Sequence, residues 1–193
     1  MIGSTKRVVL AAGLSLLAVV CSVAVTAADE PPTVPANLRV PAGHQVFMTT
    51  HATGTQNYIC LGAGLPWTFI GPQATVFNDE GEQALTHYLS PNPDEGGTAR
   101  ATWQHSADTS AVWAVAIASS TNPEYVAPGA VAWLLLQVVG TETGPDHGDK
   151  LAPTTFIQRV NTAGGTAPAG ACPAPGARAF VPYETDYVFY RAR

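Results

Sequence analysis

Residues 74–89 read ATVFNDEGEQALTHYL, and this stretch decides the fold class. A β-favouring run, Ala74 to Phe77, is followed by Asn78 to Gly81 and then by a second run, Gln83 to Leu89. Asn, Asp and Gly tolerate the left-handed backbone that tight turns require. The stretch therefore predicts a β-hairpin.

Similar short runs extend in both directions from this hairpin. The segments between them contain Gly and Pro, as in His51 to Gly54 and Gly71-Pro72, and they predict turns. No stretch has a sustained helical period flanked by capping residues. We therefore expect a single all-β domain over residues 42–193, a sandwich or barrel of roughly ten short strands.

The first 27 residues have the pattern of an export signal. Lys6 and Arg7 precede the apolar stretch Val8 to Val25, and the small residues that follow suit cleavage after Ala27. An uncleaved anchor helix is the alternative, because about 18 apolar residues are nearly enough to span a bilayer. We expect a signal peptide over residues 1–27, no membrane span after cleavage, an extended lead-in over residues 28–41, and a secreted or cell-envelope location.

Two cysteines, Cys60 and Cys172, follow the export signal. An even number of cysteines in an exported protein predicts one disulfide, and two buried free thiols are the alternative. Neither cysteine belongs to a C-x-x-C pair, which argues against thiol redox catalysis and against a zinc knuckle.

Composition and charge exclude some partners. Apolar residues make up 46% of the chain and charged residues 12%, which is typical of a folded domain. Of the nine Lys and Arg residues, Lys6 and Arg7 lie in the export signal, so seven remain beside fourteen acidic residues, a net charge of −7. This sign disfavours nucleic acid and anionic membrane surfaces as partners.

Histidines supply the candidates for catalysis. His87 shares a strand face with Leu85 and Leu89, where it must find a polar partner or lie at a cleft. His105 and Asp108, with Ser106, carry the residue types of a hydrolase, but neighbours on one loop rarely form a triad. Nothing in the spacing makes His87, His105 and Asp108 converge. The sequence therefore predicts no metal site and no cofactor.

Aromatic and charged residues supply the candidates for binding. Trp67 and Trp103 are among the tryptophans that could stack against a sugar, although in a β-domain such residues more often fill the core. Arg159 lies within the apolar run Thr154 to Val160. We expect it to pair with an internal acid such as Asp186 or Asp108.

Several motifs together resemble the secreted bacterial and fungal family catalogued as domain of unknown function 3455. They are GTQNYIC (54–60), WTF (67–69), PQA (72–74), HY (87–88), Trp103, DTSAV (108–112), AWLL (132–135), IQRVNTAGG (157–165), Cys172 and YETDYVFY (183–190). The resemblance implies export and a β-rich domain, and it supplies no activity. The family often has Gly where this chain has Thr109, so we expect an altered turn there.

The leading functional hypothesis is a non-enzymatic exported domain that binds an extracellular or cell-envelope ligand or a surface, because no spacing aligns a nucleophile with a base. One alternative is a cell-envelope hydrolase or metal-dependent enzyme that uses His87, His105 and Asp108. The other is a carbohydrate-binding module. The sequence specifies neither the ligand nor the oligomeric state.

Overall fold

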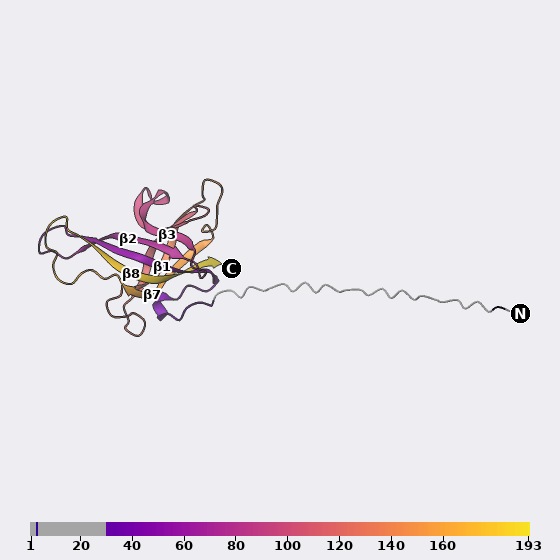
Figure 1. The fold of residues 1–193 in the computed structure, drawn as a ribbon, viewed down its shortest axis with the longest axis horizontal. Coiled ribbons are helices and arrows are strands. Elements are labelled where there is room, and N and C mark those ends of the chain that lie inside the picture. Colours follow the sequence, from indigo (N-terminus) through magenta and orange to yellow (C-terminus); the bar gives the residue numbers. More distant parts are fainter. Residues whose placement is uncertain (1–2, 4–29) are drawn as a thin grey trace.

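Strands β1 (His44–Ile59) and β8 (Arg178–Ala192) pair with each other and close the sheet into a barrel (Figure 1). The pairing runs from His44 opposite Ala192 to Ile59 opposite Arg178. The computed structural model describes Gly3 and residues 30–193. Apart from Gly3, the predicted signal peptide and its cleavage site lie outside the described residues.

The strands between these two follow one another around the barrel in chain order, each antiparallel to the next. Successive connections therefore alternate between the two ends of the barrel. The end that carries the β1–β2, β3–β4, β5–β6 and β7–β8 connections is called the cavity end below. The remaining elements are β2 (Thr68–Phe77), β3 (Gln83–Asn92), β4 (Thr98–His105), β5 (Ala111–Ser120), β6 (Trp133–Glu142), β7 (Thr154–Gly164) and the 3-10 turns η1 (Ala36–Leu38) and η2 (Pro93–Glu95).

The all-β prediction and the hairpin after Phe77 are confirmed, but the strands are fewer and longer than expected: the barrel has eight. β1 continues through Gly54 and β2 continues through Gly71 and Pro72, where the sequence predicted turns. A Cβ on Gly54 would lie 2.2 Å from the carbonyl oxygen of Gln73. This glycine therefore marks a close approach of two strands rather than a turn.

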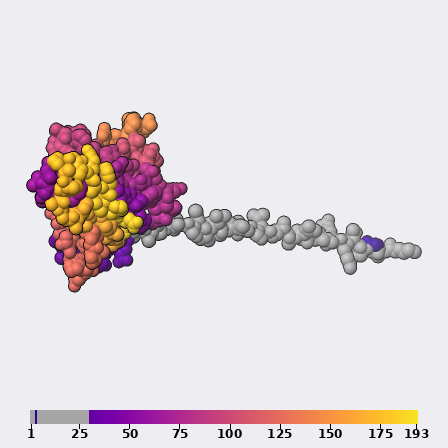
Figure 2. Space-filling model, turned by 60° about the vertical axis from the view of Figure 1, so that its left-hand side comes forward, coloured from indigo at the N-terminus to yellow at the C-terminus, as the bar shows by residue number. Residues whose placement is uncertain are grey.

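The barrel has an inner and an outer apolar core. Along β8, Tyr187 and Phe189 point into the barrel, whereas Val188 and Tyr190 alternate with them and belong to the outer core. Residues of the lead-in cover this outer core: Leu38 is fully buried, and its carbonyl oxygen accepts a hydrogen bond of 2.6 Å from Gln158 Nε2. Figure 2 shows β8 in yellow beside atoms of the N-terminal half of the domain.

The predicted disulfide between Cys60 and Cys172 is present, with the two Cα atoms 5.5 Å apart across a sequence separation of 112 residues. Backbone hydrogen bonds reinforce it: Cys172 N–H donates to Leu65 O at 2.9 Å and Gly64 N–H donates to Cys172 O at 3.0 Å. The Gly-, Ala- and Pro-rich β7–β8 connection is thereby tied to the β1–β2 connection, at the left of Figure 1.

No helix among the described residues is long and apolar enough to cross a membrane.

Replacing Gly54 with Ala should destabilise the barrel by about 1–3 kcal/mol, because the new methyl group would collide with the backbone of β2. Urea unfolding of the oxidised protein measures this change. The matched control is Thr53→Ala on the exposed face beside it, which should change the free energy of unfolding by no more than about 0.5 kcal/mol. Equal effects of the two substitutions would contradict the close-approach interpretation.

Candidate functional site

A cavity of about 230 Å³ lies inside the barrel at the cavity end. The wall is incompletely paired there: β2 and β3 pair no further toward this end than Ala74 opposite His87, and β4 and β5 no further than Ala101 opposite Ala114. The β3–β4 hairpin continues beyond both points without pairing with β2 or with β5. The cavity lies behind these two gaps.

The end of this hairpin that pairs with neither β2 nor β5 packs against the outer face of the barrel. Trp113 Nε1 on β5 donates a 2.8 Å hydrogen bond to Ser90 Oγ, and Asn92 Nδ2 donates to Val139 O at 3.2 Å. The tip of the hairpin therefore packs against β5 and β6 from outside. This bend ends the backbone pairing of the hairpin with β2, although the Leu89 side chain still lies against Gly71 of β2.

An aromatic cluster forms the inner wall of the cavity. His87 on β3 lies directly opposite Trp103 on β4, and the two rings stack with centroids 4.1 Å apart and planes 15° from parallel. The ring of Tyr187, from β8, meets both edge-on, with centroid distances of 5.1 Å. All three side chains are buried. Two residues from separate sequence hypotheses, His87 and Trp103, thus belong to one cluster.

His87 is a neutral imidazole. Its Nδ1 lies 2.9 Å from the carbonyl oxygen of Thr102, which can only accept, so the proton is on Nδ1 and Nε2 carries a lone pair. Burial lowers the pKa of His87 to about 3; the Thr102 hydrogen bond opposes this effect and the charge of Arg159 adds to it. The side chain therefore contributes an acceptor and a flat apolar surface, and no charge.

Arg159 on β7 brings a positive charge to the cavity. It lies opposite Leu134 on one side and Tyr187 on the other, so it points into the barrel. Its Nε and Nη2 donate to the carbonyl oxygen of Ala132 at 3.1 and 2.7 Å. The expected pairing with Asp186 or Asp108 is wrong, because Arg159 forms no ion pair with any residue from 30 to 193.

The polar groups around Arg159 are buried and incompletely bonded. Burial raises the pKa of Tyr187 well above its ordinary value, and the nearby guanidinium opposes this effect. Gln56 on β1 is buried, and its Nε2 has no hydrogen-bond partner among the described residues; the same is true of Trp103 Nε1. The sequence analysis did not single out Gln56 as a site residue, although it shares an inward strand face with the small residues Ala52 and Gly54.

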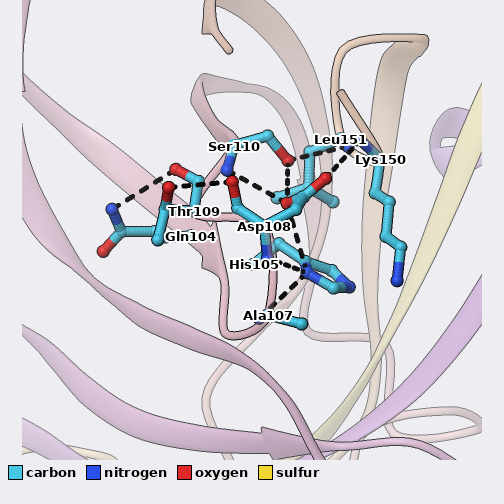
Figure 3. Close-up of polar contacts among 8 residues, drawn as sticks. All are labelled: Gln104, His105, Ala107, Asp108, Thr109, Ser110, Lys150 and Leu151. Carbon is cyan, nitrogen blue, oxygen red and sulfur yellow. Dashed lines mark hydrogen bonds and ion pairs between the residues drawn. The ribbon is translucent and has the colours of Figure 1, made fainter. Parts of the chain in front are cut away.

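His105, the last residue of β4, and Asp108, in the β4–β5 connection, lie at the opposite end of the barrel (Figure 3). Ser110 Oγ donates to Asp108 Oδ1 at 2.7 Å, and the backbone N–H groups of Ala107 and Asp108 donate to His105 Nδ1 at 3.2 Å. Lys150 N–H donates to Asp108 Oδ2 at 2.9 Å. The serine that bonds to the acid is Ser110, whereas Ser106, the serine of the hydrolase hypothesis, makes no side-chain hydrogen bond to His105 or Asp108 in the described structure, so no catalytic triad is formed. The cluster fixes a turn.

The ionisation of these groups fits that structural role. Burial lowers the pKa of His105, against the opposing effect of Asp108. Burial acts to raise the pKa of Asp108, but the hydrogen bonds from Lys150 and Ser110 outweigh it and hold the pKa below its ordinary value.

Thr109, in the same turn, has a φ of 58°, the left-handed region that glycine adopts most easily. A glycine would adopt this conformation without strain, whereas here a β-branched residue is held in a strained conformation.

Thr109→Gly should consequently raise the free energy of unfolding by about 1 kcal/mol, the relieved strain minus the added flexibility of the unfolded chain. Thermal unfolding detects this as a higher Tm. The control is Thr155→Gly within β7, which has no left-handed backbone to relieve and should be destabilising. A lower Tm for Thr109→Gly would refute the strain.

Asp186 points to the outer surface, away from the cavity. Its Oδ1 lies 2.6 Å from His51 Nδ1, and its Oδ2 accepts from Asn161 Nδ2 at 2.7 Å. Asp79 Oδ1 lies 3.1 Å from the other ring nitrogen of His51. The hydrogen bond to Asp186 raises the pKa of His51; partial burial opposes it and Asp79 adds to it.

The tryptophans do not form an exposed sugar platform. Trp103, Trp113 and Trp133 are buried, and only Trp67, in the β1–β2 connection, is half-exposed. The exposed large apolar side chains of residues 30–193 instead surround the cavity end, on its connections and the adjoining strand ends. They are Leu61, Leu65, Phe69, Ile70, Leu89, Ile117 and Phe180. A ligand would reach the cavity across an apolar rim.

Among the described residues, no group of three or more His, Cys, Asp or Glu side chains is arranged so that it could hold a metal ion.

The fold and the cavity define a class: a closed eight-stranded antiparallel barrel with a ligand-sized cavity at one end. Within that class, the chain belongs to the family described as Protein of unknown function (DUF3455), whose model matches residues 41–191. The match spans the barrel and confirms the resemblance seen in the sequence. No curated protein and no solved structure matches the chain.

His51 and His87, whose pKa values shift in opposite directions, should be distinguishable by NMR. His87 should stay neutral down to about pH 4, and His51 should titrate above 6.5. His51 therefore stabilises the fold below about pH 6.5, and this contribution is lost as the pH rises through its folded-state pKa. His51→Gln and His87→Gln assign the signals, and a His87 resonance that titrates near neutrality would contradict its burial.

Proposed function

We propose that this protein binds one small organic ligand in the cavity of the barrel and does so without catalysing a reaction. The observation that carries the proposal is the cavity of about 230 Å³ beside the stacked rings of His87 and Trp103. An apolar cavity of about 150 Å³ holds benzene, and eight-stranded barrels can enclose one small ligand. The space fits one substituted ring.

The lining of the cavity favours binding over catalysis. It contains no Asp, Glu, Ser, Thr or Cys, the side chains that commonly act as nucleophile or acid–base pair. His87 is neutral, with its Nδ1–H already donated to a backbone carbonyl. Burial raises the pKa of Tyr187 well above its ordinary value, which keeps the phenol protonated. The remaining lining residues are mainly apolar, as in binding pockets generally.

The place of action belongs to the same proposal: the protein works outside the cytoplasm, on an extracellular or cell-envelope ligand. The sequence pattern of residues 1–27 and the disulfide between Cys60 and Cys172 support this location. Disulfides persist in oxidising compartments and are rare in the cytosol.

The test uses toluene and benzyl alcohol, two uncharged aromatic probes, with the disulfide-bonded protein. Binding should shift the indole Nε1–H resonance of Trp103, which is assigned with Trp103→Phe. Ala101→Phe, which fills the cavity, should weaken binding by roughly tenfold or more. Ala163→Phe adds the same side chain at an exposed position of β7 and should leave binding unchanged. Binding that survives Ala101→Phe in a folded protein would rule out the cavity as the site.

A further inference from the structure

Two arginines line the cavity, and only one of them has an anionic partner. Arg100 donates from Nε and Nη2 to the two carboxylate oxygens of Glu95, at 2.8 and 2.7 Å. Glu95 also accepts from Asn92 Nδ2, and these hydrogen bonds, that of Arg100 first, lower its pKa to about 2. The guanidinium of Arg100 is therefore neutralised by the protein.

Arg159 has no such neutralisation. Two of its nitrogens share one backbone carbonyl oxygen, that of Ala132, and the guanidinium also lies within hydrogen-bonding reach of the uncharged hydroxyl of Tyr187. No acidic residue lines the cavity. The stacked imidazole of His87 carries no charge and offers Nε2 as an acceptor.

A half-buried guanidinium without an anion is electrostatically incomplete. Removing a charge from water is costly unless an opposite charge or several hydrogen bonds replace the solvent. The planar fork of Arg matches the geometry of a carboxylate, which it binds through two parallel hydrogen bonds. The N–H groups of Arg159 that bond to neither Ala132 nor Tyr187 are the donors that the protein leaves for such a group.

We propose that the ligand is a small monocarboxylate with a flat, apolar body, most simply an aromatic acid. Its carboxylate binds Arg159, and its ring lies in the apolar part of the cavity beside His87 and Trp103. This inference rests on the proposed function, since it names the ligand class for the same cavity.

The number of charges and the size of the cavity limit the ligand class. Arg159 is the one cation of the cavity that lacks a described partner, so a dianion such as a phosphate monoester would retain uncompensated charge. About 230 Å³ accommodates one ring with a short side chain but not a fused polycycle or a long acyl chain. Polar sugars would leave their hydroxyls against apolar walls at the cost of unmade hydrogen bonds.

The experiment compares phenylacetate with phenylacetamide, which has nearly the same shape and no charge, by calorimetry on the disulfide-bonded protein. We expect phenylacetate to bind roughly tenfold more tightly or better. Arg159→Met should reduce phenylacetate to the affinity of the amide and leave phenylacetamide within about twofold. Arg191→Met removes the same charge from an exposed position at the opposite end of the barrel and is the matched control.

Each outcome has one consequence. Equal affinities of acid and amide for the unmodified protein would overturn the carboxylate assignment and leave the cavity as a binding site for neutral ligands. Failure of both to bind, together with toluene and benzyl alcohol, would overturn the binding function as well. If Arg159→Met does not fold, Arg159→Lys serves instead: it keeps the charge but loses the fork, and an affinity between those of acid and amide supports the assignment.

Discussion

The antiparallel ladder between β1 and β8 is the interaction on which the rest of the structure depends. It joins the two ends of the domain along nearly their whole length, which removes the exposed edges that an open sheet would present. It also decides which side chains can meet: Gln56 comes from β1, His87 and Trp103 from the β3–β4 hairpin, and Arg159 from β7. These residues face one enclosed space only because the sheet is closed.

One half of the barrel interior is packed with side chains, and the other half contains the cavity. Trp103, Leu151 and Phe189 belong to the inner core, and the bonded turn around Asp108 lies at the end opposite the cavity. The other half retains about 230 Å³. Ala101 and Ala114 are small residues of the cavity lining, and larger side chains there would fill the cavity.

Local signals in the sequence were sufficient for some features and not for others. The turn at Asn78 to Gly81 and the pairing of Cys60 with Cys172 follow from residue type and cysteine number, and both are present. The barrel has eight strands and not roughly ten, because glycines that locally suggest turns lie within strands. Gly54 allows the close approach of β2, and β2 itself continues through Gly71 and Pro72. The prediction of an acidic partner for Arg159 was wrong for a similar reason. Asp186 alternates with the inward-pointing Tyr187 along β8, so in the closed barrel it points outward. His87 and Trp103 were each proposed separately, and only the register of β3 and β4 brings them together.

Because each strand pairs with its neighbours in the chain, the connections at the cavity end can vary in length and composition without rethreading the barrel. Two long connections there, β5–β6 and β7–β8, touch each other through the bridge between Ala130 and Gly165, and one of them is tethered by the disulfide. The rim of the cavity and the barrel that supports it are therefore separable: changes in these connections would reshape the rim and leave the β1–β8 ladder intact.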